Sequence, residues 1–153
     1  MNIEVTNQKP LIAVAVKVTA MTMDKIVEAM DVGFAKLMAY IVEQGKQIAG
    51  APYCCYTNAS EDFLQFDMEF GIPVNEAVAA SGDIFMSQTY EGKAVSGTHK
   101  GAYKDLESTY TAMMDYVKEN SLELTGVYYD YYISNPADTP ENELLTQVVF
   151  PIK

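Results

Sequence analysis

The sequence predicts an α+β fold in which two pseudo-symmetric ββαββ repeats form an eight-stranded, mostly antiparallel sheet with both helices on one face. Three observations support this prediction: two amphipathic helical segments, a pair of extended segments before and after each of them, and the recurrence of this order in the second half of the chain. A helix that carries one apolar stripe must bury it, and the face of a sheet is the simplest place to do so.

The length of the chain sets the number of domains. It has 153 residues, of which 49% are hydrophobic and 20% charged. A chain of this size forms one compact domain and buries roughly 70% of the surface that its unfolded form exposes. We therefore expect one domain over residues 1–153, with repeat halves at about 1–74 and 83–153.

The first half contains four extended segments and one helix. Two alternating apolar and polar segments are separated by Lys9 and Pro10, and a helical segment runs from Thr22, a candidate cap, to Gly45, a candidate stop. Extended segments over residues 52–58 and 62–74 complete this half. The expected buried stripe of the helix recurs at helical spacing and consists of Ile26, Met30, Phe34, Leu37, Met38 and Ile41.

The second half repeats the same order. Residues 84–99 give two extended segments around Glu91 and Gly92, and residues 127–135 and 143–153 give the last two. Between these pairs, a helical segment ends near Asn120, a candidate stop. Its expected buried stripe consists of Tyr103, Leu106, Tyr110, Met113, Met114 and Val117.

The two halves align with two slightly different offsets. Setting Pro73 on Pro151 gives 151 − 73 = 78 positions, and setting Gly50 on Gly126 gives 126 − 50 = 76. The second offset brings Tyr53 opposite Tyr129 and Tyr56 opposite Tyr132, and the longer loop "PADTPEN" absorbs the difference of two residues. Symmetric halves leave a groove where they meet, and ligand sites favour such seams.

The charge of the chain limits its partners. The formal net charge is −11, with ten lysines and no arginine. Nucleic-acid binders neutralise phosphates with clustered Lys and Arg, so we expect no direct binding to nucleic acid. Neither a long apolar run nor a basic start followed by an apolar stretch is present, so we expect no membrane span and a cytoplasmic protein. This acidity has two interpretations: it serves solubility alone, or it gives the protein a preference for neutral or cationic ligands.

The sequence offers no pattern for a cofactor or a metal. Cys54 and Cys55 are neighbours and point to opposite faces of a strand, which disfavours a disulfide or a metal pair. No phosphate-binding glycine loop and no nucleophile motif is found. His99, the one histidine, precedes a helix, where capping or turn hydrogen bonding is the expected role.

Several short motifs, in this order and spacing, resemble a known family. They are "GAPYCCY" and "DMEFGIPV" in the first half, then "HKGAY" entering a helix, a glycine followed by "YDYY", the loop "NPADTPENEL" and a closing strand that ends in "PI". Together they resemble GyrI-like small-molecule-binding domains, which also occur as effector-binding domains of AraC-type and MerR-type multidrug-responsive regulators. The resemblance covers nearly the whole chain.

This resemblance implies a doubled ββαββ fold that binds bulky, apolar, often aromatic and cationic compounds in a groove between the halves. Tyr129 and Tyr132 match the family's strand tyrosines, and Tyr53 and Tyr56 match their partners in the first half. The family's acidic position falls on Gln147, which carries no charge. The internal repeat suggests a substitute, because Glu69 is equivalent to Gln147 at the offset of 78.

Strand alternation decides which tyrosines share a face. Tyr129 and Tyr131 share one face and Tyr128 and Tyr132 the other, so we expect Tyr129 and Tyr131, with Tyr53, to line the groove. Tyr56, Tyr103 and Tyr132 are further possible ligand contacts. The other reading is that the tyrosines reflect strand propensity alone, and that Glu69 lies on the solvated face of a strand whose other face carries Leu64, Phe66, Met68 and Phe70.

Three functions follow from these residues and from the resemblance. The first is a stand-alone binding protein that sequesters hydrophobic compounds or reports them to a separate protein partner, since tyrosine faces and one carboxylate attract aromatic cations. The second is a hydrolase of strained, cyclopropane-bearing toxins, with Glu69 as the catalytic group. The third is a protein-binding, gyrase-inhibitor-like modulator with an acidic surface. Binding without catalysis is the primary interpretation.

Overall fold

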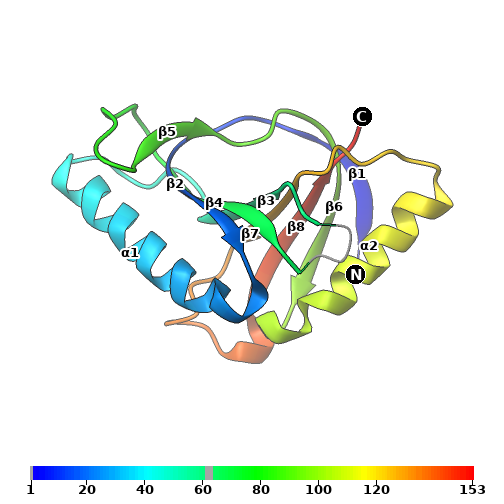
Figure 1. Ribbon diagram of the computed structural model, residues 1–153. Helices are drawn as coiled ribbons and strands as arrows, with labels where there is room; N and C mark the ends of the chain where they lie inside the picture. The colour runs from blue at the N-terminus through cyan, green and yellow to red at the C-terminus, as the bar shows by residue number, and fades with distance from the viewer. Residues whose placement is uncertain (1, 61–63) are drawn as a thin grey trace. The chain divides into compact units, whose positions relative to one another are not determined.

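A computed structural model describes residues 2–60 and 64–153, with only the backbone described at Met23. The fold is α+β, with an eight-stranded antiparallel sheet and two helices (Figure 1), which confirms the predicted fold class. The chain divides into two compact units, one of Lys9–Tyr90 and one of Met1–Gln8 with Glu91–Lys153.

The unit Lys9–Tyr90 contains four strands in the order β3-β4-β2-β5 and one α-helix. All of its neighbouring strands are antiparallel. A short 3-10 helix, η1 (Met23–Lys25), leads into α1 (Ile26–Glu43). The strands are β2 (Ile12–Met21), β3 (Tyr53–Thr57), β4 (Phe66–Pro73) and β5 (Phe85–Gln88). Leu64, expected on the apolar face of β4, precedes the strand and is exposed.

The other unit contains four strands in the order β1-β6-β8-β7 and the second α-helix. These strands are β1 (Ile3–Gln8), β6 (Gly92–Lys100), β7 (Tyr128–Tyr132) and β8 (Leu145–Pro151). The helix α2 (Leu106–Glu119) follows the 3-10 helix η2 (Tyr103–Asp105), and a third 3-10 helix, η3 (Glu141–Glu143), precedes β8.

The compact units are not the same division of the chain as the sequence repeats. The first strand of each repeat pairs within the unit of the other repeat: β1 pairs with β6, and β5 pairs with β2. The segment Lys9–Leu11 therefore does not close a hairpin between β1 and β2. The alternation of apolar and polar residues identifies such strands, but tertiary packing decides which strand each of them pairs with.

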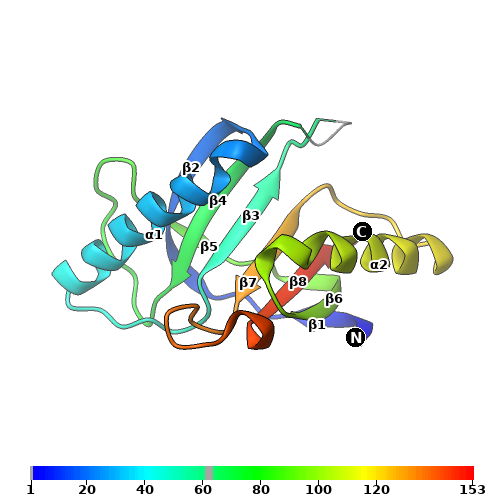
Figure 2. The ribbon, with the colours of Figure 1, turned by 90° about the horizontal axis from the view of Figure 1, so that it is seen from below.

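The helix α1 packs against β2 and β4, the two central strands of its unit, and α2 packs against β6 (Figure 2). The two helices combine small and large residues with their sheets in opposite ways. Gly33 of α1 lies against Phe70 and Val16, whereas Met113 of α2 lies against Gly97. A large strand residue meets a small helix residue in one unit, and the reverse holds in the other, which keeps both cores densely packed.

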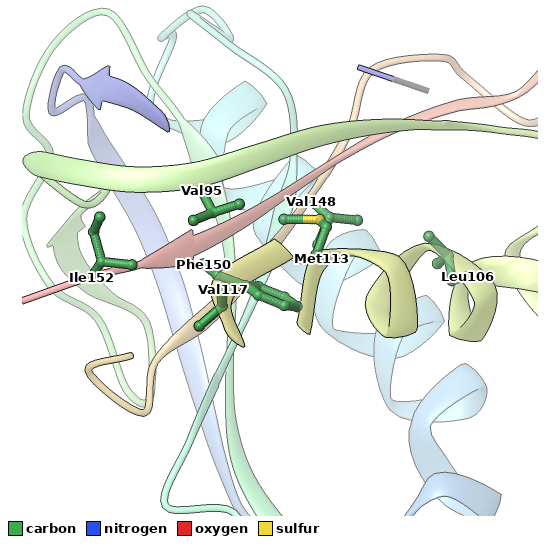
Figure 3. Packing of buried hydrophobic residues seen from close by; sticks show 7 residues of the cluster. All are labelled: Val95, Leu106, Met113, Val117, Val148, Phe150 and Ile152. Atoms are coloured by element: carbon green, nitrogen blue, oxygen red, sulfur yellow. The ribbon is translucent and has the colours of Figure 1, made fainter. Parts of the chain in front are cut away.

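The core beneath α2 is a single hydrophobic cluster (Figure 3). Met113 and Val117 project from the helix toward Val148 and Phe150 of β8. Tyr103, Tyr110 and Met114, which the sequence places on the buried stripe, are partly buried and pack against this cluster. The predicted apolar face of α2 is therefore the face that covers its unit.

The sequence correctly predicts how α1 ends, but not how it is capped at its start. Gly45 has a φ of 67° and the N–H of Lys46 donates to the carbonyl of Ile41, so the helix stops where predicted, in a glycine-terminated motif. Thr22 does not cap the helix through its side chain; its hydroxyl binds the Asp24 carboxylate instead. Met38, expected in the buried stripe, is 39% exposed.

Candidate ligand-binding site

Strand register supports the internal alignment of the two halves. Tyr53 lies opposite Gly71 and Cys55 opposite Glu69, while Tyr129 lies opposite Val149 and Tyr131 opposite Gln147. These pairs are related by the offset of 76 on the first strand and 78 on the second (129 − 53 and 149 − 71). Glu69 and Gln147 are therefore structurally equivalent, as the repeat predicts.

Glu69 is the centre of a polar group on the sheet face opposite α1. Its Oε2 atom accepts a hydrogen bond of 2.7 Å from the Tyr53 hydroxyl and another of 2.8 Å from the Ser87 hydroxyl. Tyr53 belongs to β3 and Ser87 to β5, so donors come from both sides of β4. The carboxylate is half-buried, and Oε1 takes part in neither of these bonds.

Small residues make room for this arrangement. Gly71 pairs with Ala15 on one side and with Tyr53 on the other. A Cβ atom on Gly71 would lie 2.2 Å from Cζ of Tyr53, so the ring lies directly over the glycine. Tyr53 is fully buried, and its hydroxyl holds the carboxylate. Its main contribution is thus to position Glu69 rather than to offer an exposed ring.

A lysine adds a competing charge near this carboxylate. Lys17 of β2 lies directly across from Glu69 and is exposed. Side chains opposite one another in an antiparallel pair have Cβ atoms roughly 5 Å apart. Besides the Asn58 amide, Lys17 also helps to lower the pKa of the neighbouring Asp67, so the Lys17 ammonium is a positive charge on this face that a cationic ligand near Glu69 would meet.

The neighbouring carboxylate of Asp67 has a structural role. It accepts a hydrogen bond from the Asn58 side chain and another from the backbone N–H of Ala20, and both of these residues have positive φ angles. The Asn58 amide, followed by the Ala20 N–H, lowers the pKa of Asp67 below its usual range. Asp67 therefore fixes two strained turns at this end of β4.

At the equivalent positions of the other unit, a neutral glutamine lies beside two tyrosines. Gln147 donates a hydrogen bond of 3.0 Å to the Ser96 hydroxyl. The rings of Tyr129 and Tyr131 are stacked, with centroids 5.5 Å apart and an interplanar angle of 4°. Val149 stands where the first repeat has Gly71, so Tyr129 has no room to lie over this position as Tyr53 lies over Gly71. The predicted face shared by Tyr129 and Tyr131 is thus confirmed.

Of the other candidate tyrosines, Tyr56 and Tyr132 lie on the helix side of their strands, and Tyr103 begins η2. Tyr56 makes an edge contact with Phe66, and Tyr103 makes one with Tyr132. Burial raises the pKa of the Tyr103 hydroxyl. The structure therefore separates Tyr56 from Tyr53, and Tyr132 from the stacked pair Tyr129 and Tyr131.

The helix side of the second unit holds buried polar residues, of which the sequence singles out His99 but not Thr109 or Asp130. His99 is buried, with Nδ1 2.7 Å from the Thr109 hydroxyl and Nε2 3.0 Å from the carbonyl of Ala102. The second contact is the expected turn hydrogen bond. The Tyr110 hydroxyl donates to the carboxylate of Asp130, which is 1% exposed. Ser87 was also missed, because only its strand pairing brings it near Glu69.

A depression lies at the start of α2, in the unit that contains β6 and β8. Its volume is about 500 Å³, and its lining carries charges of both signs from Lys100, Lys104, Asp105 and Glu141. No residue that the sequence proposes for ligand binding lines it. We base the site on the Glu69 hydrogen bonds rather than on this open, mixed-charge surface.

Two structural features bear on cofactors and membranes. Within residues 2–60 and 64–153, no three His, Cys, Asp or Glu side chains are grouped so that they could hold a metal ion. No helix in this part of the chain is long and apolar enough to cross a membrane.

A family model described as a GyrI-like small-molecule-binding domain matches residues 1–153. The chain belongs to this GyrI-like family. The match confirms the resemblance found in the motifs. A comparison with curated proteins finds no match.

Solved GyrI-like structures share the fold at low sequence identity. The EcmrR C-terminal domain is 19% identical with a TM-score of 0.85, and the match covers 99% of this chain and 97% of that one. In the EcmrR–DNA complex the match covers 57% of the longer chain. SAV2435 bound to tetraphenylphosphonium is 14% identical with a TM-score of 0.66, covering 100% and 94%. A Listeria innocua hydrolase encoded by lin2189 is 12% identical with a TM-score of 0.67, covering 99% and 91%.

Proposed function

We propose that this GyrI-like domain binds bulky aromatic compounds, with a preference for cations, and acts in the cytoplasm to sequester them or to report them to a separate protein partner. The observation that carries the proposal is the half-buried Glu69 carboxylate, held through Oε2 by the hydroxyls of Tyr53 and Ser87.

The geometry around Glu69 suits a cation. The two hydroxyl donors fix the carboxylate without cancelling its charge, and Oε1 takes no part in their hydrogen bonds. A carboxylate near low-dielectric protein attracts a cation more strongly than one in bulk water. Phe85, which pairs with Ala15 on this face, is half-buried and adds an aromatic surface beside the acid.

The stacked rings of Tyr129 and Tyr131 form a separate aromatic surface, in the other unit. Tyr129 is buried and Tyr131 is half-buried, so the ring of Tyr131, stacked on Tyr129, is the platform on which an aromatic compound gains area burial and cation–π attraction. Gln147 supplies hydrogen bonds beside the platform, but no charge. The two units therefore make separate contributions in this proposal: Glu69 supplies the preference for cations in one unit, and the tyrosines supply an aromatic surface in the other.

The test compares a cationic probe with a neutral one. Tetraphenylphosphonium, the ligand named for SAV2435, and triphenylphosphine oxide, which is neutral and of similar shape, are titrated into wild-type protein and into Glu69→Gln by isothermal calorimetry. We expect Glu69→Gln to weaken tetraphenylphosphonium binding at least about tenfold, because the Coulomb attraction is lost. Triphenylphosphine oxide binding should change less than about twofold.

Gln147→Glu serves as the matched control, because it adds a carboxylate at the equivalent position of the other repeat. We expect it to strengthen binding of the cation if the equivalent face also contacts the ligand. Equal losses for the cationic and the neutral probe in Glu69→Gln would refute the electrostatic part of the proposal. No binding of either probe to the wild type would refute the choice of ligand class.

Hydrolysis of strained cyclopropane-bearing compounds is the second candidate function. The Tyr53 hydroxyl and the Glu69 carboxylate form a proton-sharing pair 2.7 Å apart, which is the kind of pair that general acid–base chemistry needs. In such a reaction Glu69 takes a proton from water, and the water oxygen forms a bond to one ring carbon as the strained C–C bond breaks. The other carbon of the broken bond then takes up the proton held by Glu69. Mass spectrometry of a cyclopropane substrate after incubation tests this: addition of one water that Glu69→Gln abolishes supports it, and unchanged substrate refutes it.

A further inference from the structure

The outer face of α1 carries apolar side chains that are exposed to solvent. Val27, Val32 and Val42 are 68%, 64% and 72% exposed, and Met38 is 39% exposed. Ala35 and Ala39, between them in sequence, are exposed as well. At about 100° per residue these six positions fall within roughly 140° of the helix circumference, so they share one face, on which the exposed acids Glu28 and Asp31 lie between them. We refer to them as the outer stripe.

The second repeat shows what this face looks like without such a stripe. α1 begins at Ile26 and α2 at Leu106, so equivalent helix positions differ by 106 − 26 = 80. The same offset relates Gly33 and Met113, which both face the central strands. The positions equivalent to Val27, Ala35 and Met38 are Glu107, Asp115 and Lys118, all exposed and charged. Solvent contact alone therefore does not require an apolar face at this place in the fold.

Charge around the outer stripe indicates the kind of partner. The exposed acids Glu28 and Asp31 lie on the same face, and Glu43 lies at its end. Lys36 is already bound to Asp83 in an ion pair. The last turn of α1 has no basic residue, so Glu43 lies unfavourably near the negative end of the helix dipole. Positive groups from a partner would pair with the exposed acids and would also offset the unfavourable position of Glu43 at the helix end.

We propose that the outer stripe docks an amphipathic helix of another protein, one with an apolar stripe flanked by Lys or Arg. Val27, Val32, Met38 and Val42 supply the apolar contact area, and the small Ala35 and Ala39 let a second helix approach closely. The net charge of −11 repels a second copy, an anionic bilayer and nucleic acid alike, whereas it attracts a basic helix. This surface is separate from the Glu69 site, on the other face of the sheet.

The test uses synthetic 18-residue helices with a fluorescent label. One carries a leucine stripe flanked by lysines, one the same stripe flanked by glutamates, and one lysines with glutamine in place of leucine. Fluorescence anisotropy measures their binding to the wild type and to two variants of α1. Val32→Gln/Val42→Gln removes apolar area, and Glu28→Lys/Glu43→Lys reverses the flanking charge. All four side chains are exposed, so circular dichroism should show unchanged folding.

A matched variant separates the outer stripe from net charge. Glu107→Lys/Glu119→Lys on α2 changes the net charge by the same amount as Glu28→Lys/Glu43→Lys. We expect only the leucine–lysine peptide to bind the wild type and the α2 variant, with binding at least tenfold weaker in both α1 variants.

Three results would overturn the proposal. The first is absence of leucine–lysine peptide binding to the wild type, and the second is equal weakening in the α1 and α2 charge variants. The third is a wild-type dimer in sedimentation analysis that Val32→Gln/Val42→Gln dissolves, because the occupant would then be a second copy of this chain.

Discussion

Replacing Gly71 with alanine should disrupt the hydrogen bond that positions Glu69. A Cβ atom at residue 71 would lie 2.2 Å from Cζ of Tyr53 and 2.4 Å from its hydroxyl oxygen, closer than real carbon and oxygen atoms approach. The glycine belongs to a buried part of β4, so the ring has to move. Displacing a well-packed side chain costs about 1–3 kcal/mol. Losing the bond to the half-buried carboxylate costs about 1 kcal/mol more.

We therefore expect Gly71→Ala to lower the free energy of unfolding by about 2–4 kcal/mol, or the melting temperature by roughly 4–16 °C. Urea unfolding followed by circular dichroism gives the value. The same substitution in a Tyr53→Ala background is the control, because the clash is then absent and the cost should fall below about 1 kcal/mol. The reasoning is refuted if Gly71→Ala costs as much without the Tyr53 ring as with it.

Three further predictions concern charge. Lys17→Gln should raise affinity for a cationic ligand roughly two- to fivefold in the same calorimetric assay, because it removes a positive charge, across from Glu69, that repels the ligand. An unchanged affinity would show that the charge of Lys17 does not act on the ligand. The Asn58 amide lowers the pKa of Asp67, so this carboxylate stabilises the fold above about pH 4 and less at lower pH; Asp67→Asn should flatten the acid limb of stability against pH. Burial raises the pKa of Tyr103, so its protonated form stabilises the fold below about pH 10 and this contribution is lost as pH rises further; Tyr103→Phe should reduce alkaline destabilisation, and an unchanged alkaline limb would contradict this.

The sequence predicted those features that depend on local periodicity and on the repeat. The offsets of 76 and 78 correctly placed Glu69 equivalent to Gln147, since alternation along paired strands preserves the position of each side chain. Alternation also placed Tyr129 and Tyr131 on one face, where they stack. Both results follow from geometry that a single strand already contains.

Other features depend on choices made between distant segments. The exchange of the edge strands β1 and β5 leaves no local signal, because an edge strand alternates in the same way whichever neighbour it joins. This exchange brings Ser87 to Glu69, so Ser87 could not be found from sequence. The burial of Tyr53 depends on Gly71, which was visible in "EFGIPV" but whose role requires the strand register.

The outer stripe of α1 shows a second limit of periodicity. Met38 was assigned to the buried stripe because it follows Phe34 at helical spacing, yet it is 39% exposed and lies on the outer face. When a helix is apolar over most of its circumference, spacing alone does not tell which stripe faces the sheet. The buried face of α1 is set by Gly33 and Leu37, which fit closely over β2 and β4.

The most direct test of the central claim is the ratio of affinities for the cationic and the neutral probe, measured by calorimetry in wild-type protein and in Glu69→Gln. If the carboxylate held by Tyr53 and Ser87 selects cations, the wild type prefers the cationic probe, and Glu69→Gln lowers this ratio at least about tenfold. A ratio that is the same in both proteins would contradict the account, because the charge of Glu69 would then play no part in recognition.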